Sequence, residues 1–112
     1  MTFQVFHILL ALADGDRHGY GIILEVARHT GDRIRLGTGT LYTAISRLVD
    51  AGWIAESRRR PGAGDDARRR YYRLTDAGRE ALGAESERLD AAVTVARQKR
   101  VLRAQPARPR RN

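Results

Sequence analysis

The side chains best suited to recognition chemistry lie between residues 38 and 50. Leu41, Ile45 and Leu48 recur at i, i+4 and i+7, which predicts a helix with one buried face. The opposite face carries small hydroxyl groups and charged groups, from Thr40, Thr43, Ser46, Arg47 and Asp50. An arginine can hold a guanine edge with two hydrogen bonds, whereas small hydroxyls suit phosphates or thymine methyl groups. We therefore expect this face to contact nucleic acid, with Arg47 as the main reader of base sequence.

Basic residues gather in two short stretches of the chain. Residues 58–73 hold seven arginines against Asp65 and Asp66, and residues 97–112 hold seven Lys and Arg with no acid. Residues 1–57 carry five arginines and six acids, within a chain whose formal net charge is +8. A genomic preference for Arg over Lys does not explain this segregation of charge. Such clustering is typical of a protein with a polyanion partner.

Catalytic and metal-binding motifs are missing from the sequence. There is no cysteine, which excludes disulfides, thiol nucleophiles and Cys-based metal sites. His7, His18 and His29 lack ligand spacing, and the serines have no evident His/Asp partners. Residues 37–39 lack the third glycine and the βαβ setting of a nucleotide-binding fingerprint. We expect no enzymatic activity, no metal and no cofactor, and we expect His18 to make a local hydrogen bond or a phosphate contact.

Periodicity and capping signals place helices and strands around these residues. Helices are expected at residues 3–12, 19–29, 39–51 and 75–102, and strands at 53–57 and 69–74. Thr38 and Thr75 are the expected N-caps of the last two helices, and Gly31 and Gly52 are the expected left-handed residues past helix ends. Residues 32–36 alternate apolar residues with arginines, which fits a short strand or an extended link.

The resulting fold class is mainly α with a small β-hairpin (α+β). Three helices followed by a basic hairpin are the winged helix-turn-helix arrangement, in which the third helix enters the major groove of DNA. We expect residues 1–74 to form a winged helix-turn-helix DNA-binding domain, 75–103 a long C-terminal dimerisation helix, and 104–112 a disordered basic tail. Trp53 is expected to plug the core beneath the hairpin rather than to hold a ligand.

Two sets of candidate site residues follow from this arrangement. Residues 3–12 are apolar on more than one side, which predicts contact with two partners, and the last helix has a thin apolar stripe. The candidate dimerisation residues are Phe3, Phe6, Leu10, Leu82, Leu89, Val93 and Ala96.

Tyrosine hydroxyls can donate hydrogen bonds to phosphates, although such tyrosines also serve as half-buried structural residues. Hairpin arginines bind phosphate with little dependence on base sequence. The candidate DNA-binding residues are His18, Tyr20, Thr38, Thr40, Tyr42, Thr43, Ser46, Arg47, Arg58, Arg59, Arg60, Arg68, Arg69 and Arg70.

Four linked motifs give the chain a family resemblance over about Ile8 to Leu82. They are His18-Gly-Tyr-Gly-Ile22, Gly37-Thr-Gly-Thr-Leu-Tyr42, Arg47-Leu-Val-Asp-Ala-Gly-Trp-Ile54 and Arg69-Arg-Tyr-Tyr-Arg-Leu-Thr-Asp-Ala-Gly78. In this order and spacing they resemble the PadR family of bacterial transcriptional regulators, in the short branch with a single C-terminal helix. The chain departs from the pattern at Thr43, where many members have proline, and in its Arg-rich tail.

The resemblance implies a homodimer built through the last helix, usually packed against the partner's first helix. It also implies binding to a palindromic operator, usually as a repressor, and in many members release of the DNA by a small-molecule effector or a change of conditions. Neither the operator nor an effector can be named from the residues.

Two other functions fit parts of the sequence. A winged-helix adaptor could use the basic hairpin to bind an acidic protein partner without specific DNA binding. An RNA-binding winged helix would need aromatic residues to stack on exposed bases, and the seven Phe, Trp and Tyr mostly fit the core or the tyrosine motifs.

No apolar run approaches the roughly 20 residues of a membrane span, and residues 1–12 lack the features of a signal peptide. A cytoplasmic protein with no membrane partner is the simplest expectation.

Overall fold

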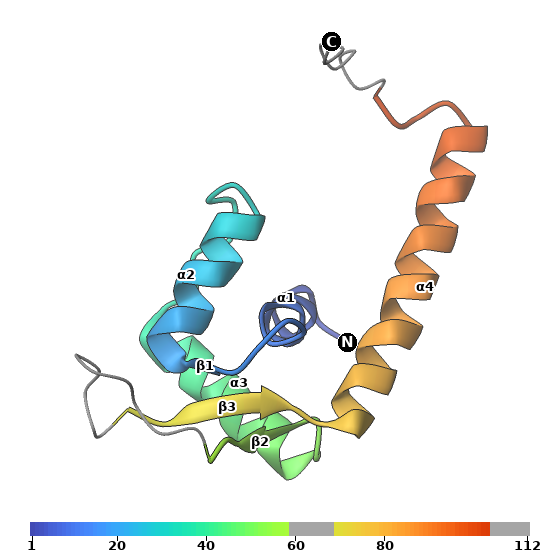
Figure 1. Cartoon of the computed structure of the whole chain (residues 1–112). Helices are drawn as coiled ribbons and strands as arrows, with labels where there is room; N and C mark the ends of the chain where they lie inside the picture. The colour runs from blue at the N-terminus through green and yellow to red at the C-terminus, as the bar shows by residue number, and fades with distance from the viewer. Residues whose placement is uncertain (59–68, 104–112) are drawn as a thin grey trace, which may run out of the picture.

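The computed structural model describes residues 1–58 and 69–103 of the 112-residue chain. The elements of these residues follow one another as α1 (Phe3–Ala11), β1 (Arg17–His18), α2 (Gly19–His29), α3 (Thr38–Asp50), β2 (Ile54–Glu56), β3 (Tyr71–Leu74) and α4 (Asp76–Gln98) (Figure 1). This order confirms the winged helix-turn-helix prediction: three helices, a small sheet and a long last helix.

The core lies where the apolar faces of the helices meet. Ile8 and Leu9 of α1, Ile22 of α2 and Leu41 of α3 are fully buried, because each lies on the helical stripe that faces the other helices. α1 packs against both α2 and α4, which confirms that its broad apolar surface contacts two elements. Trp53 is half-buried and packs against this core, as predicted.

The sheet has one strand more than the sequence predicted. β3 is the central strand of an antiparallel sheet ordered β1-β3-β2, with Ile54 opposite Leu74 and Arg17 opposite Tyr72. The hairpin of β2 and β3 was predicted, whereas β1 was missed because two polar residues carry no strand pattern. Through β1, the start of α2 is hydrogen-bonded to the hairpin.

The predicted helix ends are correct in most places and wrong in two. Thr75 caps α4 by accepting a hydrogen bond from the Gly78 N–H at 3.0 Å, as predicted. Thr38 does not cap α3, because it is the first helical residue. The N-cap is Gly37, which has an extended backbone and makes no side-chain hydrogen bond to the helix. α4 ends at Gln98 rather than at residue 102, because Arg100 adopts a left-handed backbone with φ 59° that ends the helix.

The turns after α2 and α3 follow the predicted glycines. Gly31 and Gly52 have φ of +58° and +79°, in the left-handed region that glycine adopts without strain. Asp32 also has a left-handed backbone, with φ 64°, and residues 34–36 form a link that is neither helix nor strand. The link is fixed by Thr30, whose hydroxyl donates to the Val26 carbonyl at 2.7 Å and accepts from the Ile34 N–H at 3.1 Å.

α4 begins in the core and then leaves it. Leu82 is 6% exposed and belongs to the same apolar cluster as the first three helices. Beyond Leu82 no described residue of the chain is buried, and α4 extends away from the sheet (Figure 1). No helix within residues 1–58 and 69–103 is long and apolar enough to span a bilayer.

Candidate nucleic-acid interface

The exposed surface of α3 divides into an outer ridge and two flanks. Leu41, Ile45 and Leu48 are at most 4% exposed and anchor the helix, so positions on the opposite side point outward. The outer ridge consists of Gly39, Thr43, Ser46 and Asp50, which are all exposed. The flank facing α1 carries Thr40 and Arg47, and the flank facing the hairpin carries Tyr42 and Val49. Five of the predicted DNA-binding residues therefore share one accessible surface.

Tyr42 connects α3 to the N-terminus of α2. Gly19, the first residue of α2, is buried beneath the phenol ring: a Cβ placed on Gly19 would lie 2.4 Å from the Tyr42 hydroxyl oxygen. Glycine therefore leaves room for the phenol to lie over the helix start, where backbone N–H groups and the helix dipole favour an anion. Gly19 was not among the predicted site residues, although it is the second residue of the motif His18-Gly-Tyr-Gly-Ile22.

His18 and Arg69 meet at a hollow beside the start of α2. His18 is the N-cap of α2, and its Nδ1 accepts a hydrogen bond from the Gly21 N–H at 3.0 Å. In the neutral ring the proton then sits on Nε2, which lies 3.1 Å from Nη1 of Arg69. Both facing groups are donors in that state. An oxygen of an anion beside them would accept from both, so the arrangement suits a phosphate.

The predicted phosphate-binding residues surround this hollow. His18, Tyr20, Tyr42, Arg69 and Arg70 line it together with Gly19. Tyr20 is 56% exposed and Tyr42 is 47% exposed, so both side chains reach the surface beside the hollow. The prediction that His18 makes a local hydrogen bond is confirmed by its bond to the Gly21 N–H.

The hairpin arms carry exposed arginines at their described ends. Arg58, Arg69 and Arg70 are exposed, whereas the predicted Arg59, Arg60 and Arg68 lie outside the described residues. Arg70 has its Nε 4.0 Å from a carboxylate oxygen of Glu56. Glu56 and Asp50 border the same groove between α3 and the hairpin. Asp50 is the last residue of α3 and would repel a phosphate backbone, so the C-terminal end of the helix is the less suitable part to contact one.

The predicted dimerisation residues fall into two groups. Phe3, Leu10, Leu89 and Val93 are 65%, 37%, 41% and 39% exposed, and Phe6 and Ala96 are half-buried. Leu82 lies in the core of its own chain, which leaves its side chain unavailable to a second subunit. The apolar surface available for a partner is therefore on α1 and on the outer two-thirds of α4.

Two histidines pair between α1 and α2, away from α3. His7 Nδ1 and His29 Nε2 share a hydrogen bond of 2.9 Å, and the rings of Phe3 and Phe6 meet His7 edge-on. Burial lowers the pKa of His7, and the neighbouring His29 lowers it further. No group of three or more possible metal ligands clusters within residues 1–58 and 69–103. The histidine pair is thus a structural contact between the two helices.

Comparison with known proteins agrees with this geometry. The model of the "Transcriptional regulator PadR-like family" matches residues 8–84, more than half of the chain. The chain is 37% identical over 84 residues to the transcriptional regulator Rv3488 of Mycobacterium tuberculosis, which covers 75% of this chain and 73% of that protein.

Solved structures show the same fold. A PadR family transcription regulator from Clostridium difficile is 26% identical, with a TM-score of 0.68 over 87% of this chain and 97% of that one. Bacillus subtilis PadR, solved in complex with operator DNA, is 22% identical, with a TM-score of 0.61 over 99% of this chain and 53% of that one. With a family model matching residues 8–84 and the winged-helix fold in place, the chain belongs to the PadR-like family of transcriptional regulators and is not an enzyme.

Proposed function

We propose that this chain is a sequence-specific regulator that binds double-stranded DNA as a homodimer, with α3 in the major groove. The observation that carries the proposal is the exposed polar surface of α3 beside the donor-lined hollow at the start of α2. A helix fits the major groove, and a neighbouring phosphate site would fix its depth and direction. Bacillus subtilis PadR was solved in complex with operator DNA, which supports DNA as the partner proposed for this chain.

The phosphate anchor is proposed at the hollow around the N-terminus of α2. His18 Nε2 and the Arg69 guanidinium supply convergent donors, and the hydroxyls of Tyr20 and Tyr42 lie beside them. These contacts give affinity and register without reading the base sequence. Arg58, Arg70 and the further hairpin arginines, Arg59, Arg60 and Arg68, are proposed to add phosphate contacts whose strength falls with salt.

Base reading is proposed for the N-terminal part and the α1 flank of α3. Arg47 is the proposed reader of a guanine edge, and Thr40 and Thr43 are the proposed contacts with thymine methyl groups or phosphates. Thr38 and Ser46 lie exposed on the same helix and are proposed as further phosphate or base contacts. Asp50 supports this orientation, because its charge disfavours contact of the C-terminal end of α3 with the phosphate backbone.

The dimer is proposed to form through α4 and α1. Leu89, Val93 and Ala96 recur at i, i+4 and i+7 along the part of α4 that leaves the core, and Phe3 and Leu10 expose apolar surface on α1. We keep residues 1–74 as the proposed DNA-binding part, 75–103 as the proposed dimerisation segment and 104–112 as a proposed basic tail. A two-fold dimer would bind a palindromic operator, as a repressor that an effector releases.

A binding selection on genome fragments, with purified protein at about 150 mM salt, tests the proposal. We expect enrichment of one palindrome with half-sites about one helical turn, or a whole number of turns, apart. Uniform recovery of all fragments that disappears as salt rises would contradict it. The basic residues would then serve non-specific attraction only, and an adaptor that binds an acidic protein would become the better explanation.

A further inference from the structure

One face of α1 carries a histidine between two exposed apolar side chains. Phe3, His7 and Leu10 follow one another at i, i+4 and i+7, so they form one stripe along the helix, here called the α1 stripe. Phe3 and Leu10 are exposed, whereas His7 is half-buried and is the only titratable side chain of α1. The rings of Phe3 and His7 meet edge-on, with 4.7 Å between their centres. A titratable group thus lies at the centre of the surface that α1 offers to the proposed dimer.

His7 also joins α1 to α2. Its Nδ1 shares a hydrogen bond of 2.9 Å with Nε2 of His29, the last residue of α2, and the two rings are stacked with their centres 5.1 Å apart. A hydrogen bond between two imidazole nitrogens needs one N–H and one lone pair, so it exists only while one of the two nitrogens is unprotonated. When both nitrogens carry protons, the bond is lost and two positive charges face each other between the helices.

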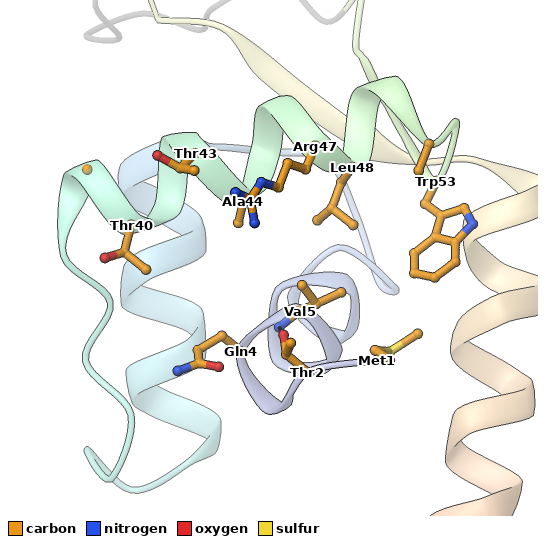
Figure 2. A pocket seen from close by; sticks show the side chains of 12 residues that line it. Met1, Thr2, Gln4, Val5, Thr40, Thr43, Ala44, Arg47, Leu48 and Trp53 are labelled. Atoms are coloured by element: carbon orange, nitrogen blue, oxygen red, sulfur yellow. Dashed lines mark hydrogen bonds between the residues drawn. The ribbon is translucent and has the colours of Figure 1, made fainter.

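The α1 stripe is turned away from α3. A hollow of about 810 Å³ opens between the start of α1 and α3, where Gln4 and Val5 lie opposite Thr40 and Arg47 (Figure 2). Val5 is on the side of α1 opposite the stripe, because two residues along an α-helix are separated by about 200°. α1 packs instead against α2 and α4. The contact of the histidine pair is therefore one of those that hold the stripe in position.

The charged groups of α2 do not stabilise a charge on His7. Burial is the larger cause that lowers the pKa of His7, and His29 lowers it further. Glu25 is the only carboxylate of α2, and it is ion-paired with Arg28 and, at 3.5 Å, with Arg17. The hydrogen bond from Arg28 is the largest cause that lowers the pKa of Glu25, and the charge of His29 also contributes. The carboxylate of α2 thus interacts with the second histidine of the pair and leaves His7 uncompensated.

The charged groups of α4 that lie near its packed end have partners of their own. The half-buried carboxylate of Glu85 is paired with Arg88 of the same helix. Arg79 donates to the Ala13 carbonyl at 3.0 Å, past the end of α1. Within the described chain, neither helix that packs against α1 therefore supplies a carboxylate that would favour the charged form of His7.

We propose that the α4 of a second copy covers the α1 stripe and that acidification releases this copy by protonating His7. The proposal rests on the proposed homodimer. The occupant is α4 because its apolar side chains beyond Leu82, from Leu89 and Val93, are exposed in their own chain and match the apolar parts of the α1 stripe. A palindromic operator needs both subunits, so acid would also weaken operator binding.

The direction of the effect follows from proton linkage. Apolar side chains of the second copy remove water from His7, and desolvation disfavours a charged imidazole. Protonation of His7 is therefore harder in the dimer than in the monomer, so association expels protons at any pH where the monomer binds them. The dimer is at full strength above the pKa that His7 has in the monomer, and it weakens as the pH falls through that value toward the lower one in the dimer.

Sedimentation equilibrium of the full chain without DNA tests the proposal. Between about pH 7.5 and pH 5.5, we expect the dissociation constant of the dimer to rise about tenfold or more. His7→Gln should give a dimer whose dissociation constant stays nearly constant, and His29→Gln should keep part of the dependence, because His7 is still covered. An unchanged constant in the parent protein would overturn the proposal. A dimer that tightens in acid would overturn it too, since a carboxylate of the second copy, such as Asp90, would then be pairing with His7.

An NMR titration separates a failure of this proposal from a failure of the proposed dimer. The His7 resonances should titrate at least about half a pH unit lower in the parent dimer than in the Leu89→Arg monomer. His18 lies outside α1, and its resonances should shift alike in both samples. Equal titration of His7 in a sample that sediments as a dimer and in one that sediments as a monomer would refute the cover over His7 and leave the dimer standing. If the Leu89→Arg sample were itself a dimer, α4 would not be the occupant and the proposal would fail.

DNA binding is a separate readout. With a palindrome from the binding selection, we expect operator affinity to fall in acid more steeply for the parent protein than for His7→Gln. If the protein binds no specific DNA, the proposed regulatory function fails, while the sedimentation and NMR titrations still decide whether His7 controls the dimer.

Discussion

Arg47 is the side chain whose replacement should change specificity most directly. It lies exposed on the α1 flank of α3, where a guanidinium can reach a base edge in the major groove. We expect Arg47→Ala to cost about 1–3 kcal/mol at one base pair of each half-site and to relax the preference there. Selection or footprinting with the variant measures this.

A hairpin arginine gives the contrasting result. Arg58→Ala should weaken binding to all sequences alike and make the dependence on salt less steep, because it removes a phosphate contact only. If the footprint of Arg47→Ala were the same as that of the parent protein, α3 would be contacting DNA in another orientation.

The histidine pair makes stability depend on pH. The pKa of His7 is lowered in the folded chain by burial and by His29. Below the ordinary histidine pKa of 6.5, the unfolded chain therefore binds more protons than the folded chain. The contribution of His7 is therefore complete above that value and is lost as the pH falls through it toward the folded pKa. We expect His7→Gln to flatten the change in melting temperature between about pH 7.5 and pH 5.5.

His29→Gln is the graded comparison for that experiment. It should remove only part of the pH dependence, since burial is the larger of the two causes that lower the pKa of His7. Parallel melting curves of the parent and His7→Gln over the whole range would show that His7 does not carry the effect.

At the scale of elements, the junction between β3 and α4 sets the direction of the last helix. Thr75 donates its N–H to the Trp53 carbonyl at 3.0 Å and its hydroxyl to the Gly52 carbonyl at 2.6 Å. Gly78 is buried against the same turn, and a Cβ there would lie 2.0 Å from the Trp53 carbonyl oxygen. The Trp53 backbone and the Leu74 side chain together leave no room for a side chain at this position.

Gly78→Ala should therefore destabilise the protein, although alanine is the better helix former. We expect a loss of about 1–3 kcal/mol in the free energy of unfolding, the usual cost of overpacking, measured by urea denaturation. Gly83→Ala is the matched control, because a Cβ at Gly83 meets nothing within 4 Å and should add up to about 1 kcal/mol. Equal stabilisation by both substitutions would mean that the turn adjusts freely.

The sequence predicts best the elements whose signals are local. α2 has the predicted bounds, Gly19–His29, and the buried stripe of α3 is the predicted one, because apolar periodicity and capping chemistry act within one turn or two. β1 was missed because its strand partner, β3, lies more than fifty residues away along the chain.

Parts of the site escaped prediction for a similar reason. The close approach of Tyr42 to Gly19 joins two helices, and the hollow beside α3 depends on how α1 is placed against it. Leu82 continues the same apolar stripe as Leu89 and Val93, so periodicity alone could not show that α4 leaves the core between them. Such features follow from tertiary packing.

At the scale of the whole molecule, the exposed stripe of α4 should determine the oligomeric state. Leu89→Arg should give monomers and abolish operator binding, because an unpaired charge buried in a subunit interface costs several kcal/mol. Glu87→Arg changes charge on the opposite side of the helix and should leave the dimer intact. Sedimentation velocity distinguishes the two, and a dimer in the Leu89→Arg sample would place the interface elsewhere.

The central position of β3 has a consequence for how the protein is made. During synthesis, β1 and β2 leave the ribosome before β3, which pairs with both, and Leu82 completes the core later still. At roughly 5–20 residues per second, the three helices wait for a second or more without their sheet. A nascent chain released before Leu74 would lack the strand that joins the start of α2 to the hairpin. Abortive translation products should therefore be cleared by proteases rather than compete with the finished regulator for its operators.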